Sequence, residues 1–152
     1  MNFGLAVNVS VEIRNKAFSI QSLSDDLEAY FKNRTYGSDI KSYTIGVVCV
    51  SPQFDQFYKK EIKPKYTKGI KVINPDGIPF TLEDSFEYRI KIDFESFKNA
   101  DEEEARKLLA KEILESLVVF EKVKSKIKHF DINNFKADLE GYFKSHKLIS
   151  KH

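Results

Sequence analysis

Hydrophobic and polar residues alternate in two stretches of the chain, and a period of two is typical of β-strands. In the first stretch, from Phe3 to Ile13, the large apolar residues occupy the odd-numbered positions. In the second, the apolar residues are Phe86, Tyr88, Ile90, Ile92 and Phe94, and the residues between them include Glu87, Arg89, Lys91 and Asp93. This second strand is therefore predicted to bury one face and to leave a charged face in solvent.

Two further patterns predict strands. Residues 43–50 are apolar at both parities, which is typical of a strand that is central in its sheet or covered on both faces. Farther along, two short apolar runs, 69–73 and 78–82, flank Asn74-Pro75-Asp76-Gly77. Because proline presets the first turn dihedral and glycine accepts a positive φ, these four residues predict a hairpin turn.

Helical spacing of apolar residues predicts helical segments at 24–33, 53–60, 101–127 and 131–147. The segment at 101–127 begins with Asp101 and three glutamates, whose charges complement the positive end of a helix dipole. Asp131 is the predicted N-cap of the last helix. The two C-terminal helices are therefore the main candidates to cover the apolar side of a sheet.

The order of elements predicts the fold class. Strands that precede a run of helices are typical of the α+β class, so we expect an antiparallel sheet of about five strands with the two C-terminal helices packed on one face. The chain of 152 residues has no repeat and no linker-like segment, which predicts one domain over 1–152. In such a fold, the charged face of strand 86–94 stays uncovered unless a partner binds there.

Charge and composition narrow the function. The chain has 25 Lys and Arg against 23 Asp and Glu, a smaller positive excess than a nucleic-acid-binding or membrane-surface protein usually has. Six lysines lie between 59 and 71, interleaved with Tyr58 and Tyr66. Lysines could contact the phosphates of single-stranded nucleic acid and tyrosines could stack on its bases. A solvated loop is the preferred interpretation, and a single-stranded nucleic-acid-binding module stays as an alternative.

The single cysteine, Cys49, lies in an apolar run and is predicted to be a buried, inert thiol. One cysteine cannot form an internal disulfide. The first residues lack the basic region and unbroken apolar stretch of a signal peptide, and no run of the chain is long and apolar enough for a membrane span. We therefore expect a cytoplasmic protein without a membrane partner.

Motifs for catalysis and for metal binding are missing. The histidines, His129, His146 and His152, do not have the spacing of a helical metal site, so neither a metal nor a cofactor is predicted. The one carboxylate pair that could do general acid–base work is Asp93 with Glu95. The alternation of the strand already explains Asp93, so the prediction is a protein that is not an enzyme, with a small hydrolase or ligand-pocket protein as an alternative.

Two surfaces remain as candidates for binding a protein partner. One is the charged strand face, and the other is the connection after residue 52, where aromatic side chains stand among lysines as they do in interface hot spots. In that connection, Phe54 and Phe57 are predicted to be core residues and the two tyrosines to be exposed. The predicted partner-binding residues are Tyr58, Lys59, Lys60, Tyr66, Glu87, Arg89, Lys91 and Asp93.

The chain resembles the immunity proteins of bacterial polymorphic toxin systems in its size, its α+β layout and its lack of catalytic motifs. It also shares their composition, which is rich in Lys, Glu, Phe, Ile and Asn. The resemblance covers the whole chain but includes no residue motif, so it assigns no residue a role. It implies a non-enzymatic protein that binds and neutralises a cognate toxin domain by occlusion. Many such inhibitors are strongly acidic because their targets are basic nucleases, whereas this chain carries a formal charge of +2. The resemblance therefore implies a toxin other than a highly basic nuclease.

Overall fold

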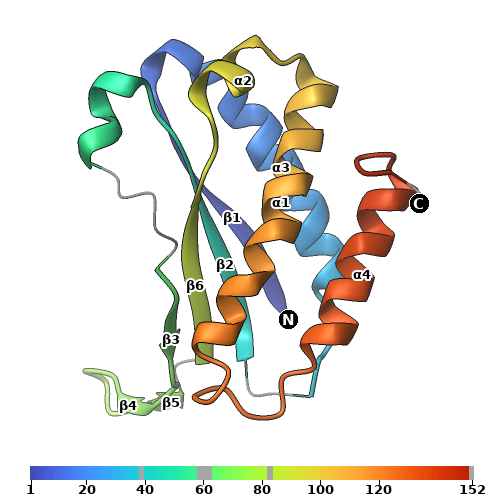
Figure 1. Cartoon of the computed structure of the whole chain (residues 1–152). Helices are drawn as coiled ribbons and strands as arrows, with labels where there is room; N and C mark the ends of the chain where they lie inside the picture. Colours follow the sequence, from blue (N-terminus) through green and yellow to red (C-terminus); the bar gives the residue numbers. More distant parts are fainter. Residues whose placement is uncertain (38–39, 58–62, 82–83, 151–152) are drawn as a thin grey trace.

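The computed structural model describes residues 1–37, 40–57, 63–81 and 84–150, without the side chains of 55–57 and 79–81 (Figure 1). Its main sheet has four strands in the order β1-β2-β6-β3. They are β1 (Asn2–Val9), β2 (Ile40–Cys49), β6 (Asp84–Lys91) and the short β3 (Lys65–Thr67). The first three strands are parallel to one another, and β3 runs antiparallel to β6.

The α+β class is confirmed, but the prediction of a purely antiparallel sheet of about five strands is wrong. Helix α1 (Ala17–Phe31) lies between β1 and β2 in the sequence and returns the chain to the end of the sheet where β1 began. A strand that follows such a crossover pairs in parallel. The continuous apolar run in β2 is itself typical of a parallel, central strand.

The predicted hairpin is present, although it stands apart from the main sheet. Strands β4 (Lys71–Ile73) and β5 (Pro79–Thr81) form a separate two-stranded sheet, and within the described ranges neither pairs with another strand. The Asn74 side-chain oxygen accepts hydrogen bonds from the backbone N–H groups of Asp76 and Ile78 at 3.0 and 2.8 Å, and Gly77 has φ +80°. The turn chemistry that the sequence indicated therefore forms as expected.

Helices α1, α3 (Glu102–Ser116) and α4 (Ile132–Ser145) all lie on one side of the sheet (Figure 1). A helix was predicted at 24–33, and the corresponding helix α1 begins earlier, at Ala17. The prediction that two helices cover the sheet did not include it. The segment predicted as one helix over 101–127 is α3 followed by the 3-10 helix η3 (Leu117–Lys122).

The ends of the parallel strands lead into short helical turns. The first strand stops at Val9, and the residues expected to extend it to Ile13 belong to the 3-10 helix η1 (Val11–Lys16). The 3-10 helix η2 (Pro52–Phe57) follows β2, and the short helix α2 (Phe94–Asn99) follows β6.

The core between sheet and helices is rich in aromatic rings. The Phe135 ring of α4 lies 4.9 Å from that of Tyr43 and 5.3 Å from that of Phe31, measured between centroids. A chain of buried hydroxyls crosses the same layer, because the Tyr88 hydroxyl is 3.2 Å from that of Tyr43 and 2.8 Å from that of Ser116. The buried face of the sheet is therefore fixed by both packing and hydrogen bonds.

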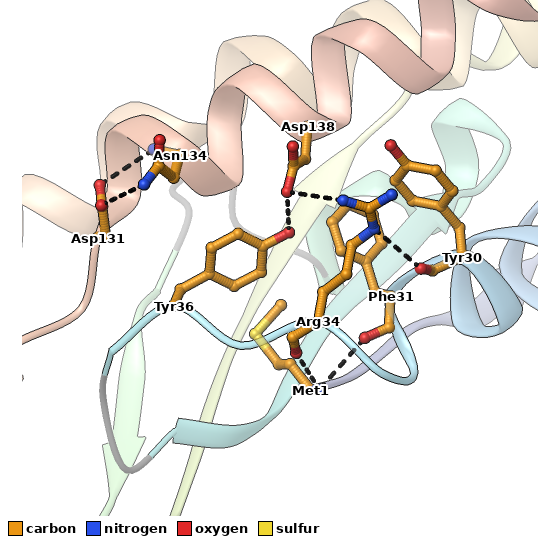
Figure 2. Close-up of polar contacts among 8 residues, drawn as sticks. All are labelled: Met1, Tyr30, Phe31, Arg34, Tyr36, Asp131, Asn134 and Asp138. Carbon is orange, nitrogen blue, oxygen red and sulfur yellow. Dashed lines mark hydrogen bonds and ion pairs between the residues drawn. The ribbon is translucent and has the colours of Figure 1, made fainter.

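Polar contacts fasten the segment after α1 to α4 (Figure 2). The Tyr36 hydroxyl donates to the Asp138 carboxylate at 2.6 Å, and the Arg34 guanidinium lies 3.4 Å from the same carboxylate. The amino group of Met1 donates to the carbonyl oxygens of Phe31 and Arg34 at 3.2 and 2.7 Å. These contacts therefore join the chain around the end of α1 to α4 and to the start of β1.

Candidate functional site

The side of the sheet opposite the helices carries the candidate site. Phe86, Tyr88 and Ile90 of β6 point into the core, so Glu87 and Arg89 between them point away from it, and both are exposed. The neighbouring strands place small residues on this open face. In register, Arg89 lies beside Gly46 of β2, and Gly46 lies beside Ala6 of β1.

Gly46 provides the space in which the Arg89 side chain lies. A Cβ atom at position 46 would stand 2.9 Å from Cγ of Arg89, closer than a side chain tolerates. The aliphatic part of Arg89 therefore lies across the backbone of β2 and not straight out into solvent. Cδ of Arg89 lies 3.7 Å from the same Cβ position, so the stem of the side chain rests beside Gly46.

A groove of about 590 Å³ lies along this face. Its floor is formed by β1 and β2, its charged side by Glu87 and Arg89, and its far wall by Lys63-Pro64-Lys65, which leads into β3. Lys63 and Lys65 are exposed. The lining residues of the floor are Ala6, Val7, Asn8, Thr44, Gly46, Val47 and Val48.

Positive charge dominates the described lining of the groove. The Lys65 ammonium lies 3.8 Å from the Glu87 carboxylate, and both side chains are more than half exposed. A surface pair of this kind contributes little to stability because water screens it. Lys63 and Arg89 add two further cations to the lining, so the groove attracts anionic groups.

The open face ends where β2 and β6 finish. Val48 shares the parity of Gly46, yet only 3% of it is exposed, and Lys91 is half-buried. Asp93 lies beyond the last residue of β6, and its carboxylate accepts hydrogen bonds from the Ser96 N–H and hydroxyl at 2.9 and 2.8 Å. Asp93 is therefore the N-cap of α2 and not a member of the strand face, as the alternation had suggested.

The second predicted surface is described only in part. Tyr58, Lys59 and Lys60 lie outside the described residues. Tyr66 was expected to be exposed, but it is half-buried and its hydroxyl donates to the Asp84 carboxylate at 3.0 Å. Phe54 was expected in the core, whereas 44% of it is exposed. Short 3-10 helices have no long apolar stripe to bury, which is why helical spacing misled the prediction there.

Sequence reasoning missed the groove floor, and it noted the lysines of the far wall only as part of the cluster between 59 and 71. Gly46 and Ala6 stand in apolar runs that predict strands, and nothing in those runs indicates which residue of another strand lies beside them. The one available signal was parity, because Thr44 and Gly46 interrupt an otherwise bulky strand on a single face. Register, which the sequence does not give, brings these small residues next to Arg89.

Asp93 and Cys49, two residues with possible catalytic chemistry, have the environments of a helix cap and a buried thiol. Hydrogen bonds from Ser96 hold the pKa of Asp93 below its usual value, whereas a general acid needs a raised one. Burial, with a smaller contribution from the charge of Asp93, raises the pKa of the Cys49 thiol to about 12. Among the residues that the structure describes, no three His, Cys, Asp or Glu side chains come together as a metal site. In the same part of the chain, no helix is long and apolar enough to cross a bilayer.

Comparison with known families gives one match. The model of the family described as immunity protein 44 matches residues 1–145. The chain belongs to the immunity protein 44 family. This membership confirms the resemblance to immunity proteins of polymorphic toxin systems. No curated protein and no solved structure matches the chain, so the family gives the function class and the groove supplies the residues for a specific proposal.

Proposed function

We propose that this immunity protein 44 family member binds its cognate toxin domain through the open face of the sheet and neutralises the toxin by covering it. The observation that carries the proposal is the groove lined by Arg89, Glu87 and Lys63-Pro64-Lys65. The helical layer occupies the other side of the sheet, so the open face is where a partner can contact the strands directly (Figure 1).

The outer edge of β1 is partly occupied by α1, which makes it a poorer candidate than the open face. The Ser24 hydroxyl of α1 accepts a hydrogen bond from the N–H of Leu5 at 2.9 Å and lies 3.5 Å from the carbonyl oxygen of the same residue. A partner strand would need these backbone groups to extend the sheet. The proposed mode is therefore docking on the face, with charge complementarity setting orientation and association rate.

Reversal of two charges on the open face tests the proposal. The partner for this test is the toxin domain that we propose is encoded beside the gene for this chain. We expect K63E/R89E to weaken binding by roughly 100-fold or more, since each reversal replaces an attraction in the groove with a repulsion. Binding is measured by calorimetry, and neutralisation by growth of cells that express the toxin domain with each variant.

The matched control is K107E/K136E, which makes the same change in net charge on exposed side chains of α3 and α4. This control should bind and protect like the natural chain, and both variants should keep its circular dichroism and melting temperature. Full protection by K63E/R89E, with loss of protection in the control, would place the interface on the helices and reject the proposal.

A further inference from the structure

We propose that the groove beside Arg89 is an acceptor site for a carboxylate side chain of the toxin. The inference deepens the proposed function and depends on it. It names the chemistry of the contact: an aspartate or glutamate of the partner that enters the groove and pairs with the Arg89 guanidinium.

Arg89 is available and positioned for such a pair. Within the part of the chain that the structure describes, its guanidinium group makes no hydrogen bond and no ion pair. The side chain is exposed at the groove, and its stem rests on Gly46. A planar guanidinium binds a carboxylate through two parallel hydrogen bonds, and a stem that is already positioned loses less freedom when the pair forms.

The charge around the groove favours an anion. Its described charged lining consists of Lys63, Lys65 and Arg89 against Glu87 alone. The Glu87 carboxylate lies 3.8 Å from the Lys65 ammonium, and among the described residues it forms no ion pair with Arg89. The lysines on the far wall would attract the incoming carboxylate and Arg89 would fix its orientation.

The same cations could attract phosphate, but the described lining of the groove has no exposed aromatic ring on which a base could stack. Single strands bind on aromatic rings that stack with the bases. Tyr88 is the one aromatic residue in the described lining, and its ring lies on the opposite face of the sheet, 3% exposed and hydrogen-bonded to Ser116. A carboxylate of a protein partner therefore fits these residues better than a polynucleotide.

Zero-length crosslinking of the R89K variant identifies the paired group. A water-soluble carbodiimide converts a carboxylate into an O-acylisourea; the lysine amine then attacks the acyl carbon, the urea leaves, and an amide forms. The carbodiimide thus takes up the elements of water lost by the pair. Mass spectrometry of the complex should find position 89 joined to an Asp or Glu of the toxin domain. Crosslinks only at lysines of the helical layer would overturn the proposal.

Affinity measurements supply the second readout. R89Q should bind the toxin domain roughly 30-fold more weakly, because its amide can replace neither the charge nor the paired geometry. R89K should lose about tenfold, since a lysine keeps the charge alone. The control K136Q removes one exposed charge from α4 and should bind like the natural chain.

The outcomes separate the two claims. If the natural chain does not bind the toxin domain, the proposed function fails and this inference fails with it. If the natural chain binds and R89Q binds equally well, the carboxylate site is rejected while the function stands. Binding of a labelled oligothymidylate that R89Q abolishes, with toxin binding unchanged, would assign the groove to phosphate and also reject the proposal.

Discussion

The reactivity of a side chain in this protein depends on its burial, and Cys49 is the clearest case. Its side chain is fully buried in the strand between β1 and β6. Burial in apolar surroundings disfavours the thiolate, and the nearby charge of Asp93 adds to this effect, so the pKa of the thiol rises to about 12. The sequence predicted this correctly, because an apolar run on both parities leaves no polar group to ionise a thiol.

We therefore predict that Cys49 resists thiol reagents in the folded protein. At pH 8 the reaction with a disulfide reagent should be at least roughly 100-fold slower than in urea, because both access and thiolate are lacking. The raised pKa also means that stability falls as the pH rises above 9.0, the ordinary value, because the unfolded thiol then ionises first. Equal labelling rates with and without urea would show that the site is open.

Arg89 and Gly46 show what a single sequence does not reveal at this scale. Arg89 was identified as a partner-binding candidate from strand alternation, and its exposed position agrees with that reasoning. Its relation to Gly46 depends on the pairing of β6 with β2, which lie far apart in the sequence. Local patterns fix which face a residue takes, whereas its neighbours across the sheet follow from register.

At the scale of elements, helix starts were the most predictable features. Asp101 and Asp131 were expected at the starts of α3 and α4, and each side chain accepts a hydrogen bond from the N–H three residues on, at 2.8 and 3.0 Å. Asp93 caps α2 in the same way. Such caps depend on short-range chemistry that a sequence displays directly.

Replacing the Asp93 cap should destabilise the protein in a pH-dependent manner. We expect D93A to lower the free energy of unfolding by about 1 kcal/mol at pH 7. Hydrogen bonds from Ser96 lower the pKa of Asp93, so this stabilisation is complete above the ordinary value of 3.8 and is lost as the pH falls through the lower folded value. Urea denaturation at several pH values measures both effects.

The matched control for this cap is D76A, which removes the same side chain from the exposed hairpin turn, where the Asp76 backbone N–H makes the turn contact. It should change stability by no more than a few tenths of a kcal/mol at any pH. An equal loss in both variants, or a D93A effect that persists in acid, would contradict the capping account.

The strand directions were the least predictable elements. The sequence shows β1, α1 and β2 in order, which is the pattern of a parallel crossover unit. The prediction instead followed the order of strands before helices, which is typical of the α+β class. The connection from β2 to β6 carries η2, β3 and the separate hairpin, so no single regular element marks the second parallel step. Long-range pairing, not local propensity, decided the topology.

In the part of the chain that the structure describes, the layer of α1, α3 and α4 lies on one side of the main sheet, and Glu87 and Arg89 are exposed on the other (Figure 1). This asymmetry is the basis of the functional account. The expectation of an open charged face holds for Glu87 and Arg89, and it fails toward the end of β2, where Val48 is buried. Family membership supplies the kind of partner, and the groove supplies the proposed place and chemistry of contact.

Site-specific photocrosslinking tests the central claim most directly. A benzophenone amino acid is placed at Glu87 on the open face or at Lys136 on α4, whose side chains are exposed to similar extents, 51% and 54%. Each variant is irradiated with the toxin domain after its fold has been verified by circular dichroism. We predict a covalent complex from the probe at Glu87 and none from the probe at Lys136. Crosslinking from Lys136 alone would contradict the account.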